Sequence, residues 1–153
     1  MIPEKVLKIL DAHGLKAIEF EEGSTPTAPL AAEALGVSVG QIAKSLLFIG
    51  KNGKYYMVLC PGDRKVSGSK LKGAIGVKSR MANAEETRSA TGFLPGGVCP
   101  FGVEGIEILL DVHLKSYSTI YPAAGTNASG VPMTFDQLQE ISKSRVCDLT
   151  VLI

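Results

Sequence analysis

The chain has 153 residues, of which 45% are hydrophobic and 20% charged, and this balance is typical of one ordinary globular domain with a sizeable core. Its longest apolar runs, such as residues 46–49 and 55–60, are far shorter than the ~20 residues of a transmembrane helix, and no secretory signal is recognisable. We therefore expect residues 1–153 to form a single soluble, cytoplasmic domain.

The formal net charge of +1 is unevenly distributed. Residues 51–80 carry a net charge of +7, and the rest of the chain carries −6. A basic segment of this kind is typical of a phosphate-binding surface, because Lys and Arg displace counterions from nucleic acid. A solvated lysine-rich face explains the composition equally well.

Neither a disulfide framework nor a metal site is indicated. Cys60, Cys99 and Cys147 are odd in number and far apart, and His13 and His113 stand alone. Zinc sites need clustered ligands at characteristic spacings, so we expect no metal and interpret the cysteines as buried or incidental thiols.

The first 45 residues predict two helices and a short strand. Apolar residues at helical spacing predict a helix over residues 2–14, and residues 17–22 have the pattern of a strand. A second helix begins after Thr27 and stops at Gly36. Ser38 and Gln41 are spaced as a capping box, which predicts a further helical turn that carries Ile42 and Ala43 and ends at Lys44.

The middle of the chain predicts a β-hairpin followed by two helices. The apolar runs 46–49 and 55–60 flank Asn52-Gly53, a strong turn signal. Residues 67–73 and 83–90 are predicted to be helices, the second with a capping box.

The last third alternates glycine-rich loops with short elements. We expect loops over residues 92–105 and 123–130, because glycine and proline are too frequent there for regular structure. The remaining elements are buried or closing strands over 106–110, 118–121 and 146–152, and a helix over 136–142. The pattern as a whole predicts a mixed α/β domain without repeats.

Familiar catalytic signatures are missing. The sequence has neither a G-x-S-x-G nucleophile elbow nor an H-E-x-x-H zinc motif. Residues 62–70 differ from a P-loop in the spacing of the glycines and in the position of the lysine. An NTPase and a triad hydrolase are therefore disfavoured.

Nearly the whole chain resembles the YbaK and prolyl-tRNA synthetase-associated editing domains. The similarity lies in the ordered series Ala31–Val37 (AAEALGV), Gln41–Phe48 (QIAKSLLF), Thr91-Gly92, Gly96–Gly102 (GGVCPFG), Asp111, and Tyr121 followed by Gly125. Each piece is weak alone, but their order and spacing are specific. The resemblance implies a mostly antiparallel central sheet surrounded by helices, and hydrolysis of the ester bond of mischarged tRNA.

The resemblance also implies the site residues. Lys44 is the central functional residue, and the G-x-x-x-P loop with Gly96, Gly97 and Pro100 shapes the aminoacyl site. Further substrate-binding residues are Thr25, Thr27, Ser45, Gly92, Val98, Cys99, Asp111, Gly125, Thr126 and Asn127, and a basic face for tRNA comprises Arg64, Lys65, Lys70 and Lys72.

A mechanism without a side-chain nucleophile follows as a hypothesis. The Lys44 ammonium would hold a phosphate or ester oxygen of the tRNA, and backbone N–H groups of Gly96 and Gly97 would polarise the ester. Water would attack, assisted by the neighbouring ribose hydroxyl.

Each of these residues also has a purely structural interpretation. Lys44 could complement a helix dipole, Thr27 could cap a helix, and Asp111 could cap a turn. The 96–100 loop could be an ordinary surface loop, and residues 125–127 a plain turn.

The substrate and the class of function stay open at this point. Ser45 stands where many members of the family have Thr, and Ala123 and Ala124 stand where cysteine-specific members tend to be more polar, which favours alanine over cysteine on tRNA(Pro). Prolyl-tRNA synthetase is a second candidate partner, and no cofactor or membrane is implied. The alternatives are a non-catalytic tRNA- or nucleotide-binding module and a regulatory partner of a synthetase.

Overall fold

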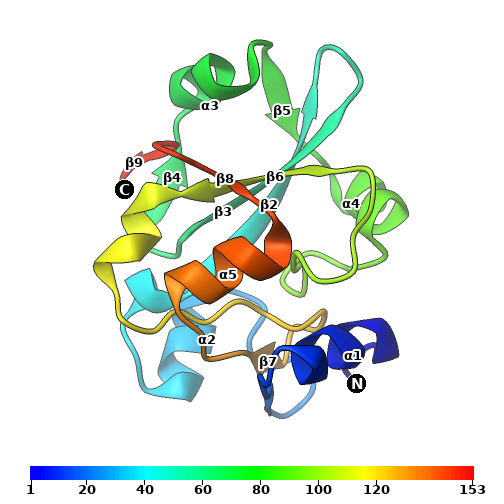
Figure 1. Ribbon diagram of the computed structural model, residues 1–153, viewed down its shortest axis with the longest axis vertical. Coiled ribbons are helices and arrows are strands. Elements are labelled where there is room, and N and C mark those ends of the chain that lie inside the picture. Colours follow the sequence, from blue (N-terminus) through cyan, green and yellow to red (C-terminus); the bar gives the residue numbers. More distant parts are fainter.

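The computed structural model describes all 153 residues and is built on a five-stranded mixed sheet (Figure 1). The strand order is β5-β2-β3-β6-β8. These strands are β2 (Ala43–Gly50), β3 (Tyr55–Pro61), β5 (Ser79–Met81), β6 (Glu107–Asp111) and β8 (Arg145–Cys147). Two small sheets pair β1 (Ile18–Glu19) with β7 (Ser129–Gly130) and β4 (Arg64–Val66) with β9 (Thr150–Leu152).

Antiparallel pairing prevails, which confirms the expected fold class. Only β3 with β6 and β6 with β8 are parallel, whereas the other four pairings are antiparallel. The hairpin of β2 and β3 forms as predicted. Gly53 adopts a φ of 79° at its turn, and the Asn52 side chain accepts a hydrogen bond from the Lys54 amide, as these residue types favour.

Five α-helices surround the central sheet, and their ends follow the capping signals of the sequence. They are α1 (Glu4–Ala12), α2 (Ala28–Leu35), α3 (Gly68–Ile75), α4 (Ala84–Thr91) and α5 (Phe135–Ser142), with short 3-10 helices η1 (Val39–Gln41) and η2 (Val112–Ser116). Thr27 caps α2, Gly36 ends it in the left-handed conformation, and Asn83 with Glu86 forms the predicted capping box. No helix has the length and apolarity needed to cross a membrane.

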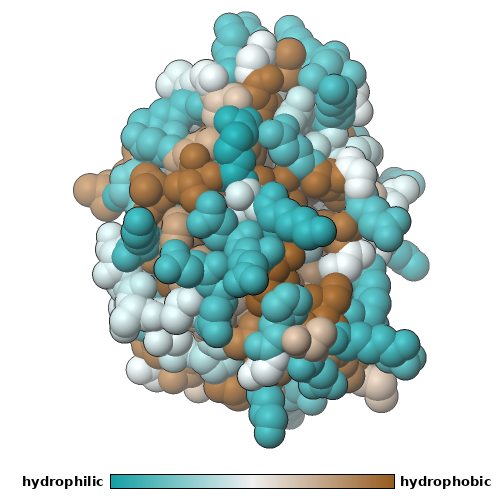
Figure 2. Space-filling model, viewed as in Figure 1, coloured by the Kyte–Doolittle hydropathy of each residue, from teal (hydrophilic) through white to brown (hydrophobic).

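The core lies on both faces of the central sheet, because successive strand residues point to opposite faces. On one face, Ala43 and Leu47 belong to a cluster of 21 buried residues, to which α1 and α5 also contribute. On the other face, Phe48 belongs to a cluster of seven that includes Leu71 of α3. Figure 1 shows α3 at the top of the molecule and α5 near its middle, above α1 and α2, and Figure 2 shows hydrophilic side chains spread over the same view with hydrophobic groups between them.

Several predicted elements differ from the structure. The strand expected over 17–22 is only two residues long, and 118–121 forms only isolated bridges through Ile120 and Tyr121. The closing strand over 146–152 is divided into β8 and β9, which join different sheets. The chain leaves the central sheet at Asp148, because the Leu149 amide and the Thr150 hydroxyl donate hydrogen bonds to the Asp111 carboxylate and not to a neighbouring strand.

The helical turn after Ser38 is shorter than the sequence predicts. Its capping box is present, but the turn is the 3-10 helix η1 and it ends at Gln41. Lys44 is therefore the second residue of β2, not the last residue of a helix. The interpretation of Lys44 as a partner of a helix dipole is wrong.

Candidate functional site

A cavity of about 230 Å³ lies at the edge of β2, between that strand, α2 and the glycine-rich loop after α4. Its lining is mostly apolar and contains no acidic residue. The wall consists of Thr25, Pro26, Thr27, Ala28, Ala31, Leu35, Ile42, Ala43, Lys44, Ser45, Leu46, Gly96, Val98, Tyr121, Ala123, Ser129 and Gly130. Six of the residues predicted for the site, from three separate stretches of chain, thus meet around one cavity: Thr25, Thr27, Lys44, Ser45, Gly96 and Val98.

The two threonines at the cavity are fixed by local hydrogen bonds. The Thr25 hydroxyl donates to the Asn127 carbonyl at 2.7 Å, and Thr25 is buried. The Thr27 hydroxyl accepts from the Leu30 amide as the N-cap of α2. The capping role predicted for Thr27 is confirmed, and it places this residue at the cavity wall.

Lys44 is half-buried on the strand face that carries Cys60. Its ammonium donates a hydrogen bond to the Arg64 carbonyl at 2.7 Å. Burial raises the pKa of the neighbouring Cys60 thiol to about 12, although the charge of Lys44 opposes the shift. An ammonium has three donors, so the single bond to Arg64 leaves two N–H groups of Lys44 for a ligand.

The glycine-rich loop approaches other backbone segments so closely that it needs glycine. A Cβ on Gly96, whose φ is +89°, would lie 2.8 Å from the Pro26 carbonyl oxygen, and a Cβ on Gly97 would lie 2.8 Å from the Thr126 carbonyl carbon. The Gly97 amide donates to the Leu94 carbonyl at 3.0 Å, so it is not free to polarise an ester as predicted. The amides of Gly96 and Val98 donate no hydrogen bond within the chain.

The other predicted substrate loop lines a second cavity of about 360 Å³. This cavity also contains acidic and aromatic residues from the chain around β1. The predicted residues found here are Gly92, Gly97, Gly125, Thr126 and Asn127. The structure therefore divides the predicted aminoacyl site into two neighbouring cavities, with Gly96 at the first and Gly97 at the second.

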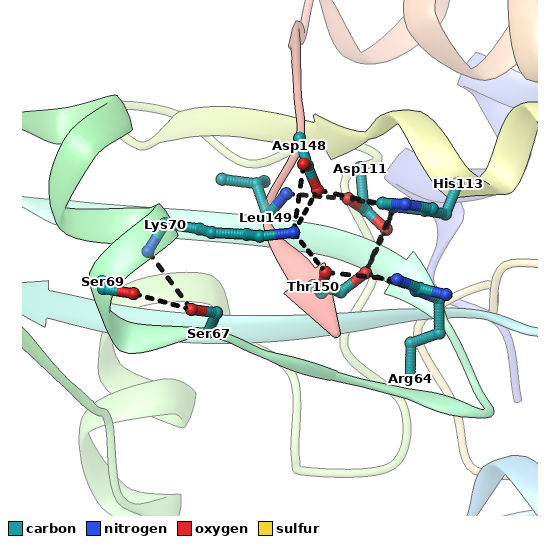
Figure 3. Close-up of polar contacts among 9 residues, drawn as sticks. All are labelled: Arg64, Ser67, Ser69, Lys70, Asp111, His113, Asp148, Leu149 and Thr150. Atoms are coloured by element: carbon teal, nitrogen blue, oxygen red, sulfur yellow. Dashed lines mark hydrogen bonds and ion pairs between the residues drawn. The ribbon is translucent and has the colours of Figure 1, made fainter. Parts of the chain in front are cut away.

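Three predicted residues lie in neither cavity. Cys99 is fully buried in the core with a pKa raised to about 12 by burial, and Pro100 beside it is buried as well. The fully buried Asp111 carboxylate accepts hydrogen bonds from the Leu149 amide and the Thr150 hydroxyl (Figure 3). The contacts of Asp111 hold β9 in place, which is neither substrate binding nor the turn capping considered from the sequence.

The predicted basic face is partly occupied by internal contacts. Arg64 donates to the Thr150 hydroxyl at 2.8 Å, and Lys70 pairs with Asp148 at 2.9 Å (Figure 3). Lys65 and Lys72 are exposed and make no hydrogen bond or ion pair within the chain. Only these two of the four predicted tRNA contacts present a free ammonium group.

The sequence interpretation missed part of the cavity wall. Ala28, Ala31 and Leu35 line it from α2, and their i, i+3, i+7 spacing could have indicated one helix face turned toward the site. Ser129 and Gly130, in contrast, reach the cavity through the pairing of β7 with β1, for which the sequence carries no local signal.

Comparisons with known proteins agree with this geometry. The profile of the family described as "Aminoacyl-tRNA editing domain" matches residues 22–141. The chain is 41% identical to the uncharacterized protein YwhH of Bacillus subtilis over 129 residues, which cover 84% of this chain and 82% of YwhH. A crystal structure of a candidate trans-editing enzyme for prolyl-tRNA synthetase is 34% identical, with a TM-score of 0.88 and 99% of both chains covered.

The same similarity extends to a domain of larger enzymes. The proline–tRNA ligase of Fervidobacterium nodosum is 36% identical over 109 residues, which are 70% of this chain and 19% of the ligase. The matched part is thus about a fifth of the ligase. On the family match and on these relatives, the chain belongs to the aminoacyl-tRNA editing domain family.

Proposed function

We propose that this chain hydrolyses the ester bond of mischarged tRNA in trans, in the cytoplasm, and that it removes a small amino acid, alanine or cysteine, from tRNA(Pro). The observation that carries the proposal is the cavity itself, which brings Lys44 together with Gly96 and Val98, whose amides donate no hydrogen bond within the chain. A cation and N–H donors around a mostly apolar cavity can orient a phosphate or an ester carbonyl while excluding bulk water.

The size and polarity of the cavity favour a small acyl group. Its volume of about 230 Å³ is below the ~300–1,000 Å³ of pockets for drug-sized ligands. The hydroxyls of Thr25, Thr27 and Ser129 in its wall are engaged in hydrogen bonds within the chain, and Ala31 and Ala123 add apolar surface. We therefore prefer alanine to cysteine as the amino acid that is removed.

The catalytic roles follow from the donors that remain free. Lys44 would hold a phosphate or ribose oxygen with the two N–H groups that Arg64 leaves unused. The amides of Gly96 and Val98 would stabilise the negative charge that develops on the ester carbonyl oxygen. Water would attack the carbonyl carbon, and the neighbouring ribose hydroxyl would assist, so that no side-chain nucleophile is needed.

The test is deacylation of Ala-tRNA(Pro), Cys-tRNA(Pro) and Pro-tRNA(Pro) by the wild type, by Lys44→Ala and by Lys16→Ala. Lys16 is an exposed lysine outside both cavities and serves as the matched control. We expect selective hydrolysis of one mischarged tRNA, retained in Lys16→Ala and lowered about 100-fold or more in Lys44→Ala. Binding of tRNA without hydrolysis of any ester would favour the binding-module alternative.

A further inference from the structure

One position on the edge of β2 lacks a partner, and it faces the cavity. Strand residues alternate in the side to which they turn their N–H and C=O groups. On the side away from β3, the Ala43 amide donates to the Tyr121 carbonyl at 3.1 Å, and the Leu47 carbonyl accepts from the Ala82 amide at 2.9 Å. Ser45 lies between them, and its N–H and C=O, which point to the same side, have no partner strand and no hydrogen bond there.

The neighbouring strand does not reach this position. The register of β2 with β5 pairs only Phe48, Ile49 and Gly50, so that β2 is a free edge at Ser45. Free strand edges are templates for pairing with another extended segment. Here the free edge is a wall of the cavity that also contains Gly96 and Val98.

The side chain of Ser45 is equally unusual. Its Oγ is buried and is the one buried side-chain oxygen or nitrogen in the chain without a hydrogen-bond partner. An unpaired buried hydroxyl is costly, and native proteins rarely keep one without a use. Ser45 therefore carries three unpaired polar groups: an N–H and a C=O at the free edge beside the cavity, and a buried hydroxyl.

We propose that the aminoacyl group of the substrate pairs with Ser45 as a one-residue antiparallel strand; this inference rests on the proposed function. Two residues opposed in a hydrogen-bonded antiparallel pair exchange both N–H···O=C bonds. The aminoacyl group carries an amino donor and a carbonyl acceptor on a single residue. Its amino group donates to the Ser45 carbonyl, and the Ser45 amide donates to the ester carbonyl oxygen, as in strand addition to a sheet edge.

This pairing accounts for orientation and selectivity together. The Ser45 amide becomes a further donor to the carbonyl oxygen as that atom gains negative charge during water attack. Cross-strand neighbours share a face of the sheet, so the substrate side chain lies beside the Ser45 hydroxyl. The free amino group, not only the ester, is then part of what the site recognises.

The test compares alanyl-tRNA(Pro) with propionyl-tRNA(Pro), which lacks only the amino group. Each enzymatic rate is divided by the spontaneous rate of hydrolysis of the same ester. We expect the acceleration to be about 10- to 100-fold smaller for the propionyl ester, as the loss of one strong hydrogen bond predicts. Equal acceleration of both esters would overturn the pairing, whereas no hydrolysis of either would contradict the proposed function itself.

Two further measurements test whether the backbone of Ser45, and not its hydroxyl, binds the amino group of the substrate. In Ser45→Ala the backbone groups remain, so the alanyl-to-propionyl ratio should persist whatever the absolute rate. Equal acceleration of the alanyl and propionyl esters by Ser45→Ala would mean that the Ser45 hydroxyl binds the amino group, and would overturn the proposal. Hydrogen exchange of the Ser45 amide should slow when the alanine amide of 3′-amino-3′-deoxyadenosine binds, and unchanged exchange in the bound protein would contradict the pairing.

Discussion

Gly96 offers a sharp test of how the cavity is built, because two separate physical effects forbid a side chain there. An alanine Cβ would lie 2.8 Å from the Pro26 carbonyl oxygen, well inside van der Waals contact. A φ of +89° also strains any L-residue by about 1–2 kcal/mol. With ~1–3 kcal/mol for the overpacked contact, we expect Gly96→Ala to lower the free energy of unfolding by about 2–5 kcal/mol.

Three other glycines separate the two effects. Gly105 has a φ of +70° but no atom within 4 Å of its Cβ position, so Gly105→Ala should cost only the strain, about 1–2 kcal/mol. Gly97 has the close contact without a positive φ, and should cost ~1–3 kcal/mol. Gly73 is in α3 with neither, so Gly73→Ala should stabilise the protein by about 0.5–1 kcal/mol.

Equilibrium unfolding in urea of all four variants, with comparison of the midpoints at a common slope, measures these differences. The expected order of stability is Gly73→Ala above the wild type, then Gly105→Ala, with Gly96→Ala last. The reasoning is refuted if Gly96→Ala is as stable as the wild type, or more stable than Gly105→Ala, because the loop would then not be held against the chain before α2.

Three other properties are predicted. Asp111→Ala should lower the free energy of unfolding by about 3 kcal/mol or more, since it leaves two buried donors at β9 unpaired; a loss below ~1 kcal/mol in thermal or urea unfolding would contradict this. An arginine partner lowers the pKa of Glu86 to about 2, so the contribution of this carboxylate to stability is present above about pH 4.5 and is lost as the pH falls through about 2. The stability of Glu86→Gln should therefore converge on that of the wild type in acid. A stability difference that persists at the lowest pH would show that it does not come from the ionised Glu86 carboxylate. Because burial raises the pKa of Cys60 and Cys99 to about 12, iodoacetamide at pH 8 should label only the half-exposed Cys147 in the folded protein, and mass-spectrometric detection of label on either buried thiol would contradict their burial.

The elements that the sequence predicted correctly depend on nearby residues. Thr27 and Gly36 delimit α2, and Asn52-Gly53 forms the turn of the hairpin, because capping and turn chemistry act within a few positions. The division of the last strand could not be predicted in this way. It depends on Asp111, which precedes Leu149 by 38 positions and has no partner that local patterning reveals.

The candidate site shows the same limit. The resemblance selected Lys44 and Gly96, and the fold brings both to one cavity. It did not separate Gly96 from Gly97, because only the backbone turn shows that the Gly97 amide is already bonded. The free edge at Ser45 is likewise invisible in the sequence, since it results from where β5 stops pairing with β2.

The most direct test of the central claim is the lifetime of the ester in Ala-tRNA(Pro) with the protein at about one-hundredth of the tRNA concentration. An editing enzyme turns over, so the account predicts complete deacylation many times faster than spontaneous hydrolysis, and Pro-tRNA(Pro) that is spared. An ester lifetime that is unchanged or lengthened, with the tRNA bound, would contradict it.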